Sequence, residues 1–344
     1  MKVLIDSRPL TGGHAIRGIG VNTTELLREL KSLKSKDLQI VEADTSSEDL
    51  SKYDIVHFSS FNPFFISIPW SKPSNTKFVI TIHDLIQLIY PKNYKPGLKG
   101  KFKFLINKYL VSKNIDAIIT ISETSKKDIC RFLGVNPSKV YVVYLSSPLR
   151  PVATNRDMER AAKKYSLPKR FALYVGDVNY NKNIPTLVKA CMIAKLPLVL
   201  VGKQSKDIEN QKLDHPELRH LKNIDWSHVL RLGFVPSEDM SAIYKLASVY
   251  IQPSYYEGFG MPILEAFENE TPVIASKTQT LIEIANGGAL FFNPYDEQDL
   301  AMKIKSISDV KTLRDQLINT GRVILTRFSW KRSAEETLRV YEKI

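Results

Sequence analysis

The 344-residue chain contains little cysteine and no long apolar run. Its two cysteines, Cys130 and Cys191, each fall in a helix-like pattern in a different half. We therefore expect no disulfide framework and a reducing compartment, the cytoplasm. No apolar stretch reaches about 18 residues, and Met1–Ile5 lead straight into a strand-like segment, so neither a membrane span nor a signal peptide is predicted.

Metal-binding motifs are also missing. The chain has no Asp-x-Asp pair, no His-Glu-x-x-His and no cluster of cysteine and histidine. Such arrangements hold a divalent cation against a diphosphate or a water molecule. We therefore expect neither a catalytic metal nor a cofactor.

Negative charge is scarce in the first half of the chain. Residues 1–150 hold 22 Lys and Arg against 13 Asp and Glu, and the rest holds 27 against 23. Such an excess suits an anionic partner, either phospholipid, a lipid diphosphate or nucleic acid, although solvated lysines give the same count. A nucleic-acid-binding protein is the rival class. No motif of that class and no lysine stripe along both halves occurs, so no nucleic acid partner is expected.

Short apolar and β-branched runs alternate with helix-length amphipathic stretches along the whole chain. The expected strands are 3–6, 38–43, 54–58, 78–82, 117–121, 140–143, 171–175, 198–201, 230–233, 249–252, 273–275 and 289–292. Strands that are apolar throughout and separated by helices indicate parallel sheets covered on both faces. Because the length exceeds what one core supports, the sequence predicts an α/β protein of two doubly wound, Rossmann-like domains.

Prolines and polar residues interrupt this alternation at 146–168, where we place the linker. The predicted domains are 1–150 and 151–327. Residues 328–344 are expected to form a final helix with Ser329 as its N-cap, which either stays on the second domain or crosses back to the first. Ligands of open α/β sheets bind at the carboxyl ends of the strands, so two domains facing each other would enclose a central cleft.

The most informative stretch is EGFGMPILE, residues 257–265, which follows the expected strand 249–252. Gly258 and Gly260 allow a tight turn with close backbone approach, and Pro262 suits the first turn of a helix. The turn then presents backbone N–H groups and a positive helix end to an anion. A diphosphate is such an anion.

Two carboxylates, Glu257 and Glu265, end this loop. Taken alone, they are equally well a loop residue and a helix-start residue that the helix dipole favours. The string EGFGMPILEAF, however, resembles the E-x7-E signature of the retaining glycosyltransferases of family 4, which have the GT-B fold. The resemblance implies that Glu257 hydrogen-bonds the donor sugar and that Glu265 holds the ribose. The sugar and the diphosphate would also contact Gly258, Phe259, Gly260 and Met261.

Residues 175–183, at the end of the first strand of the second half, resemble the family segment that faces the donor diphosphate. Gly176 and Lys182 match its glycine and lysine, and the implied role of Lys182 is to neutralise the leaving diphosphate. A solvated loop lysine is the alternative. Asp177 stands where many members have Arg, which leaves the second cation or its substitute open among Asn181, Arg17 and Lys203.

Polar residues follow several expected strands of the first half. Gly18 and Gly20 resemble the glycine loop that approaches the donor phosphates in GT-B enzymes, and the third glycine of a nicotinamide-binding fingerprint is missing. His83 matches a family histidine near the reacting centre, with Asp84 on the acceptor side. Ser122 resembles a further acceptor-side residue, and helix capping explains it equally well.

The segment Tyr90–Lys113 contains seven lysines and no acidic residue, with aromatic residues between them. This mixture is typical of a segment that lies on an anionic membrane surface or binds a lipid diphosphate. A helix with a core face and solvated lysines is the alternative. In the first case the protein is peripheral on the inner face of the membrane, and the lysines that meet it are Lys95, Lys99, Lys101 and Lys103.

The resemblance implies a metal-independent hexosyltransferase that retains the anomeric configuration, with Glu257, His83 and Lys182 as catalytic residues. The leaving phosphate would accept the proton of the acceptor hydroxyl, so no protein base is needed. Likeness to mannosyltransferases favours GDP-mannose as the donor substrate, with UDP-hexoses as the alternative, and a glycan or lipid-linked acceptor. A Glu257→Ala variant is expected to keep its fold. An epimerase or phosphorylase of the same fold is the nearest other enzyme.

Overall fold

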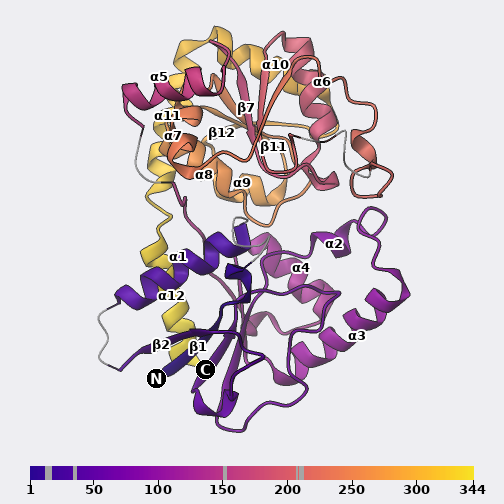
Figure 1. The fold of residues 1–344 in the computed structure, drawn as a ribbon, viewed down its shortest axis with the longest axis vertical. Helices are drawn as coiled ribbons and strands as arrows, with labels where there is room; N and C mark the ends of the chain where they lie inside the picture. The colour runs from indigo at the N-terminus through magenta and orange to yellow at the C-terminus, as the bar shows by residue number, and fades with distance from the viewer. Residues whose placement is uncertain (12–17, 34–36, 150–152, 207, 209–212) are drawn as a thin grey trace. The chain divides into compact units, whose positions relative to one another are not determined.

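The structure is a computed structural model of the chain, and it describes residues 1–11, 18–33, 37–149, 153–206, 208 and 213–344. It divides into two compact units (Figure 1). Unit 1 consists of Met1–Pro91, Lys95–Ser146 and Phe328–Ile344, and unit 2 of Lys92–Tyr94 and Ser147–Arg327. Each unit has one six-stranded parallel sheet with helices on both faces, which confirms the predicted fold class.

The sheet of unit 1 has the strand order β2-β1-β3-β4-β5-β6. Its strands are β1 (Lys2–Asp6), β2 (Gln39–Ala43), β3 (Ile55–Phe58), β4 (Lys77–Thr81), β5 (Ala117–Thr120) and β6 (Val140–Val142). The helices are α1 (Gly18–Ser32), α2 (Ile86–Ile89), α3 (Gly97–Asn114), α4 (Glu123–Leu133) and α12 (Trp330–Lys343). The strand order reverses at β1, because β2 lies on one side of β1 and β3 on the other. Ligands of such sheets bind outside the carboxyl ends of the strands at this reversal.

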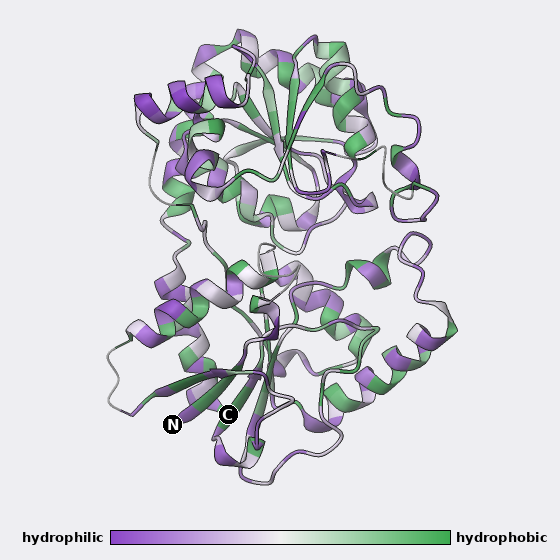
Figure 2. Ribbon diagram, viewed as in Figure 1, coloured by the Kyte–Doolittle hydropathy of each residue, from purple (hydrophilic) through white to green (hydrophobic). Residues whose placement is uncertain are grey.

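Neighbouring residues of each strand in unit 1 fill two separate cores. Val3 and Ile5 of β1 pack on one face, against apolar residues of α1 and α12. Leu4, between them, packs on the other face with residues of α3 and α4. Successive side chains of a strand point to opposite faces, so burial on both faces requires apolar residues throughout. Figure 2 accordingly shows these strands as largely hydrophobic.

The C-terminal helix α12 packs against α1 in unit 1. Ser329 caps it, and its hydroxyl accepts a hydrogen bond from the backbone N–H of Arg332 at 3.1 Å. The hydroxyl of Tyr341 lies 2.6 Å from Nδ1 of His57, and Nε2 of His57 lies 2.7 Å from Oγ1 of Thr81. All three side chains are buried, so hydrogen bonds as well as apolar packing join α12 to β3 and β4.

The sheet of unit 2 has the strand order β12-β11-β10-β7-β8-β9. Its strands are β7 (Ala172–Val175), β8 (Leu198–Val201), β9 (Val229–Gly233), β10 (Val249–Gln252), β11 (Val273–Ser276) and β12 (Ala289–Phe292). The helices are α5 (Asn155–Lys164), α6 (Ile184–Ala194), α7 (Ser237–Leu246), α8 (Met261–Glu268), α9 (Gln279–Ala285), α10 (Glu297–Asp309) and α11 (Lys311–Leu325). Sheet growth changes direction between β7 and β10, which therefore mark the expected ligand crevice.

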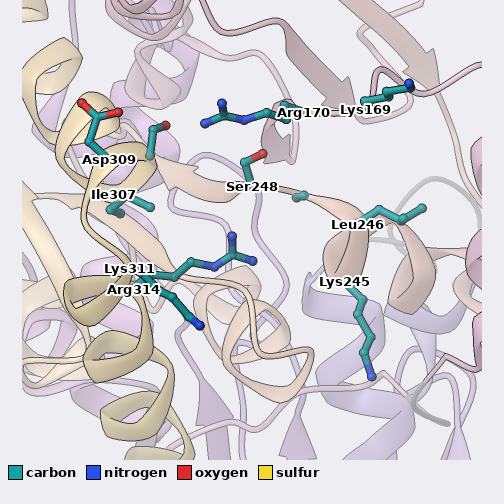
Figure 3. Close-up of a pocket in the computed structure, with 11 residues that line it drawn as sticks. Lys169, Arg170, Lys245, Leu246, Ser248, Ile307, Asp309, Lys311 and Arg314 are labelled. Atoms are coloured by element: carbon teal, nitrogen blue, oxygen red, sulfur yellow. The ribbon is translucent and has the colours of Figure 1, made fainter.

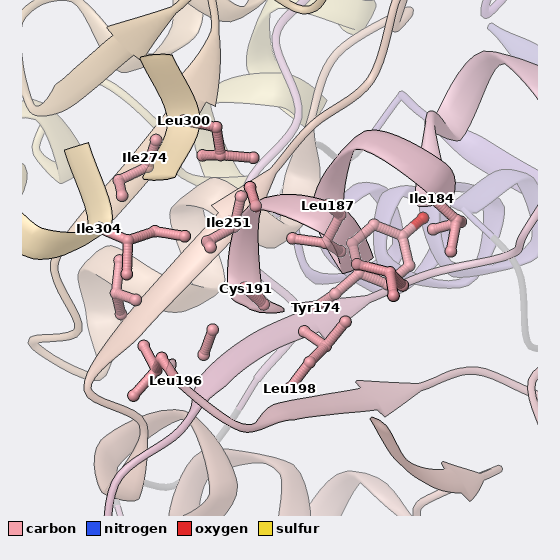
Figure 4. Packing of buried hydrophobic residues seen from close by; sticks show 14 of the residues in the cluster. Tyr174, Ile184, Leu187, Cys191, Leu196, Leu198, Ile251, Ile274, Leu300 and Ile304 are labelled. Carbon is pink, nitrogen blue, oxygen red and sulfur yellow. The ribbon is translucent and has the colours of Figure 1, made fainter. Parts of the chain in front are cut away.

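One core of unit 2 lies between the sheet and the helices α6 and α10 (Figure 4). Tyr174 of β7 and Ile251 of β10 pack there against Leu187 of α6 and Ile304 of α10. Cys191 of α6 is buried in the same core, and burial raises the pKa of its thiol to about 12. Cys191 thus acts as a small core residue.

Neither cysteine forms a disulfide, and Cys130, in α4, is partly buried. Within the residues described above, no helix combines the length and the apolar character needed to cross a bilayer.

Candidate active site

The candidate site in unit 2 forms where the loop after β10 enters α8. Gly260 is the N-cap of α8 and has a φ of 97°, in the left-handed region. A Cβ atom there would lie 2.8 Å from Cδ2 of Leu281. Glycine is therefore required by both the backbone conformation and the space. The first turn of α8 carries no acidic side chain, so its positive end is not neutralised locally.

Glu257 is buried in this loop, with 8% of its side chain exposed. The Nζ atom of Lys182 lies 2.8 Å from Oε1 and 2.9 Å from Oε2 of Glu257. Gln252 Nε2 and Ser254 Oγ also donate to Oε1, at 2.7 and 2.6 Å. Among the residues that the structure describes, Lys182 is the one donor to Oε2, so this oxygen can accept another hydrogen bond, such as one from a sugar hydroxyl.

Further polar groups hold this carboxylate in place. Gln252 accepts a hydrogen bond at Oε1 from the hydroxyl of Tyr250 and donates from Nε2 to both Ser254 and Glu257. Burial holds the pKa of Tyr250 well above its ordinary value, so its hydroxyl stays a donor. Thr280 donates to the backbone carbonyl of Glu257 at 2.7 Å. The orientation of Glu257 is therefore set before any ligand binds.

The loop after β7 carries Lys182 in the 3-10 turn Tyr180–Lys182. The next residue, Asn183, is fully buried and has a φ of 54°. Its Nδ2 atom donates to the carbonyls of Pro253 at 3.0 Å and Pro294 at 2.7 Å. Because Asn tolerates the left-handed region, this residue can end the turn and join the loops after β7 and β10. The pairing of Lys182 with Glu257 follows from this junction.

Asn181, a candidate substitute for the missing family arginine, is 3% exposed. Its Nδ2 atom donates to the carbonyl of Tyr256 at 3.0 Å, and its Oδ1 atom accepts from the hydroxyl of Tyr94 at 2.7 Å. Both ends of the amide are thus bonded inside unit 2. The role that the structure gives Asn181 is to hold the loop before Glu257.

Gly176, at the end of β7, has a φ of 149°, and a Cβ atom there would lie 2.9 Å from the hydroxyl of Tyr174. The backbone of Gly202, after β8, approaches it so closely that a Cβ on Gly202 would lie 2.0 Å from the carbonyl oxygen of Gly176. Lys203 follows directly and is exposed. Lys203, a candidate to replace the missing family arginine, therefore lies beside the Gly176 loop. Arg17, the other candidate cation, lies outside the described residues.

Glu265 lies in the second turn of α8, rather than at its start. The hydroxyl of Tyr244 donates to its Oε2 atom at 2.7 Å. Burial raises the pKa of Glu265 to about 7, against the hydrogen bond from Tyr244, which lowers it, while the nearby Glu268 raises it. Burial therefore favours the protonated form of Glu265 far more than it would be favoured in an exposed glutamate.

In unit 1, His83 follows β4 and is buried. Its Nε2 atom lies 2.9 Å from Nδ2 of Asn22, and burial lowers the pKa of the imidazole to about 4. The ring is therefore neutral, and with the amide as donor to Nε2 its proton lies on Nδ1. Asn22 belongs to α1, the helix that begins at Gly18 and buries Gly20 in its first turn. The expected glycine loop and His83 are thus linked through α1.

The two residues expected on the acceptor side each bond to a helix start. Asp84 is partly buried, and its Oδ1 atom accepts from the backbone N–H of Ile86 at 3.1 Å. Ser122 is fully buried, and its hydroxyl accepts from the backbone N–H of Ser125 at 3.0 Å as the N-cap of α4. Ser122 therefore has the helix-capping role that was one of its two predicted roles.

A cavity of about 440 Å³ lies at the amino ends of the strands β7 and β10 of unit 2 (Figure 3). Arg170, before β7, and Ser248, before β10, line it together with Lys245, Lys311 and Arg314. The loops described above follow the carboxyl ends of the same two strands. This cationic cavity is therefore separate from the candidate site.

Sequence reasoning missed several residues that orient the candidate site. Gln252 carried a signal, because it is a polar residue at the carboxyl end of an apolar strand. Tyr244, Ser254 and Asn22 carried none, since their hydrogen-bond partners are distant in sequence or depend on the loop conformation.

Comparison with known families matches both halves of the chain. The family "Glycosyl transferases group 1" matches residues 155–323, and the family "Glycosyltransferase Family 4" matches residues 16–146. The first match includes Lys182, Glu257 and Glu265, and the second includes His83.

Several curated proteins are similar in sequence. The serotype-specific mannosyltransferase WbdA of Escherichia coli is 25% identical over 306 residues, which are 85% of this chain and 37% of WbdA. The O-antigen chain mannosyltransferase B of Escherichia coli is 27% identical over 278 residues, which are 77% of this chain and 70% of that protein. The chain thus spans little more than a third of WbdA.

Solved structures share the fold. Sucrose-phosphate synthase from Thermosynechococcus elongatus has a TM-score of 0.72 at 20% identity, covering 99% of this chain and 98% of that one. HepE from Anabaena, solved with UDP-glucose, has a TM-score of 0.71 at 16% identity and full coverage of both chains. With both halves matched, the chain belongs to the family 4 glycosyltransferases, has the GT-B fold and resembles the mannosyltransferases of that family.

Proposed function

We propose that this glycosyltransferase moves mannose from GDP-mannose to a glycan or lipid-linked acceptor with retention of anomeric configuration. The observation that carries the proposal is the ion pair of Lys182 and Glu257, which lies at the carboxyl ends of β7 and β10. This is where a sheet with this strand order binds its ligand. Mannose is supported by the relatives, which include WbdA, the O-antigen mannosyltransferase B and RfbU of Salmonella typhimurium.

Glu257 and Lys182 supply the two charges that the reaction needs. Oε2 of Glu257 accepts a hydrogen bond from a hydroxyl of the donor sugar. The ammonium of Lys182 stabilises the negative charge that grows on the departing diphosphate. Backbone N–H groups of the loop Gly258–Met261 add to this stabilisation. Because hydrogen bonds already fix Glu257, little reorganisation is needed when the donor binds.

Glu265 binds the ribose of the nucleotide. Two ribose hydroxyls donating to one carboxylate favour its ionised form, so donor binding lowers the raised pKa of Glu265 and releases a proton. Lys203 is the cation that takes the place of the family arginine, since it follows Gly202 beside the Gly176 loop.

His83 and Asp84 act from unit 1. The neutral ring of His83 presents Nδ1–H as a hydrogen-bond donor near the reacting centre, and Asn22 fixes the ring. Asp84 contacts the acceptor, and Ser122 supports the same edge as the cap of α4. The departing phosphate accepts the proton of the acceptor hydroxyl, and no metal takes part. The two unpaired cysteines favour a cytoplasmic location.

A UDP-linked hexose is the second donor candidate, because HepE, which has the same fold, was solved with UDP-glucose. A thermal-shift panel of GDP-mannose, GDP, UDP-glucose and UDP separates the two. A ligand that binds only the native state raises the melting temperature. At a concentration of a hundred times its Kd, it adds about 2.7 kcal/mol to the free energy of unfolding. The proposal expects the largest shift from GDP-mannose, and a larger shift from UDP-glucose would overturn the choice of donor.

A further inference from the structure

Helix α3 of unit 1 has apolar residues on its outward face as well as its inward face. Leu110 and Val111 point into the core, at 0% and 2% exposure. On the other side, four large apolar side chains are 86%, 65%, 61% and 54% exposed; they are, in that order, Leu98, Phe102, Leu105 and Tyr109. Steps of four, three and four residues put them in one row along the helix, which we name the α3 stripe.

The α3 stripe is unusual for a surface helix. Such a helix normally presents charged and polar residues to solvent, and single exposed apolar residues are common while contiguous rows are not. A contiguous exposed apolar surface indicates a partner that covers it. Figure 2 shows hydrophobic residues interspersed with hydrophilic ones along α3.

Lysines border the α3 stripe. A rotation of about 100° per residue puts Lys101 and Lys108 on one side of it and Lys99 and Lys113 on the other. None of these side chains forms an ion pair with a described residue, and no acidic residue occurs between positions 90 and 113. Helix α3 itself therefore contributes only positive charge beside the stripe.

The position of α3 is fixed from its other side. Asn107, fully buried, donates from Nδ2 to three carbonyls of the preceding loop, at distances of 3.3, 3.0 and 2.9 Å to Asn62, Pro63 and Phe65. Asn114 donates to the carbonyl of Pro69 at 2.7 Å. Nζ of Lys103 lies 5.4 Å from the ring centroid of Phe65. The helix cannot turn its stripe inward without breaking these contacts.

We propose that the α3 stripe docks unit 1 on an anionic lipid bilayer. The four apolar side chains enter the boundary between headgroups and acyl chains, and the lysines meet the lipid phosphates. The lysines of α3 favour a bilayer over other partners. A row of apolar side chains with lysines beside it matches an apolar layer that lies under an anionic surface. The stripe includes only some of the aromatic residues between Tyr90 and Lys113, since Phe104 packs against the unit 1 core and Tyr94 bonds to Asn181.

Co-sedimentation with vesicles tests the proposal. The probes are vesicles of phosphatidylcholine alone and of phosphatidylcholine with phosphatidylglycerol. We expect the wild-type protein to bind the anionic vesicles at low salt. A stripe variant, Leu98→Ser with Phe102→Ser and Leu105→Ser, should bind at least tenfold more weakly. A lysine variant, with the exposed bordering residues Lys99, Lys101 and Lys113 changed to Gln, should lose about fivefold for each lysine that meets the surface. Lys103, which the sequence alone assigned to the membrane, is left unchanged because its Nζ lies over the ring of Phe65 on the other side of the helix.

Exposed apolar residues of unit 2 provide the matched control. Met302, Val310 and Val323 are 60%, 43% and 70% exposed, and changing all three to Ser should leave vesicle binding unchanged. In addition, brominated lipids should quench the fluorescence of the tryptophan added in a Phe102→Trp variant. They should not quench that of the tryptophan added in a Val323→Trp variant. Because the substituted side chains are exposed, unchanged circular dichroism is expected for every variant.

Three results would overturn the proposal. The first is a wild-type protein that fails to bind anionic vesicles at low salt. The second is equal loss of binding in the unit 2 control. The third is a wild-type dimer in sedimentation velocity that the stripe variant converts to a monomer, since the stripe would then bind a second copy. No nucleotide sugar is needed, so failure of the proposed function and failure of this proposal are distinguished.

Discussion

The ammonium of Lys182 lies within 2.9 Å of both carboxylate oxygens of Glu257, and the pair is largely buried. The family resemblance assigns these residues to different parts of the donor, one to the diphosphate and one to the sugar. In the ligand-free protein each neutralises the other. Removing one charge therefore leaves the other uncompensated in a partly buried site.

Changing Glu257 separates its charge from its packing. We expect Glu257→Gln to lower turnover at least about 30-fold, because a lost hydrogen bond to a charged group costs about 2 kcal/mol or more in the transition state. Glu257→Ala should also lower the free energy of unfolding, by about 1–3 kcal/mol, because Lys182, Gln252 and Ser254 lose their acceptor. The alanine variant is still expected to keep its fold, as the sequence suggests, but with this loss of stability.

Steady-state kinetics and urea denaturation measure the two effects of changing Glu257. The control is Glu297→Gln, at a 37% exposed glutamate of α10, which should change neither. Glu257→Gln turnover above about a tenth of wild type would be too large for a residue with this role.

Binding of GDP should release a proton through Glu265. Its pKa of about 7 in the folded protein lies above the ordinary 4.5, so the ligand-free site binds a proton at pH 6 that ribose hydroxyls displace. Nucleotide affinity should therefore fall as the pH drops from 8 to 6. Calorimetric titrations at pH 7 in buffers of different ionisation enthalpy measure the released proton. Glu265→Gln should remove the buffer dependence, and a wild-type protein without it would contradict the ribose role.

Stability should fall as the pH drops below about 6.5. Burial lowers the pKa of His57 to about 3 and that of His83 to about 4, both below the value of 6.5 for an exposed histidine. The unfolded chain therefore binds more protons than the folded one between these values, and each histidine lowers the free energy of unfolding by up to about 1.4 kcal/mol per pH unit. His220, whose pKa burial also lowers to about 4, acts in the same direction, whereas Glu265 with its raised pKa acts in the opposite one, so the three histidines outweigh it. Urea denaturation at pH 7.5 and 5 measures the slope. Equal stability at both pH values would speak against the buried neutral rings.

Transfer should persist in excess EDTA. Lys182 and the backbone N–H groups before α8 supply the positive charge at the diphosphate that a divalent cation would otherwise provide. Activity is measured after dialysis against EDTA, with and without added Mg²⁺ or Mn²⁺. Complete loss that the metal restores would refute metal independence, while a modest stimulation agrees with faster product release.

The fold could be predicted from the sequence because burial on both faces forces every central strand to be apolar, as with Val3, Leu4 and Ile5. The glycine turn before α8 was equally readable, since Gly260 and Pro262 have local conformational meanings. The hydrogen bonds that orient the site were not. Tyr244 meets Glu265 only through the packing of α7 beside α8, and nothing in the spacing of the two residues indicates this contact.

The surface of α3 shows a second limit. Its lysines are obvious in the sequence, but Leu98 and Leu105 resemble ordinary core residues of a helix. Because α3 has two apolar faces, the pattern of hydrophobic residues does not say which one is buried. Only the packing of Leu110 against the sheet decides it.

Titration of GDP-mannose into the wild-type protein and three variants tests the central claim, that the loop of Glu257 and Glu265 is the donor site. The account predicts one binding site per chain, at least tenfold weaker in Glu257→Gln and in Glu265→Gln. Lys245→Gln, in the cationic cavity at the amino ends of β7 and β10, should bind GDP-mannose as the wild-type protein does. Absence of binding, or binding that only Lys245→Gln weakens, would contradict the account.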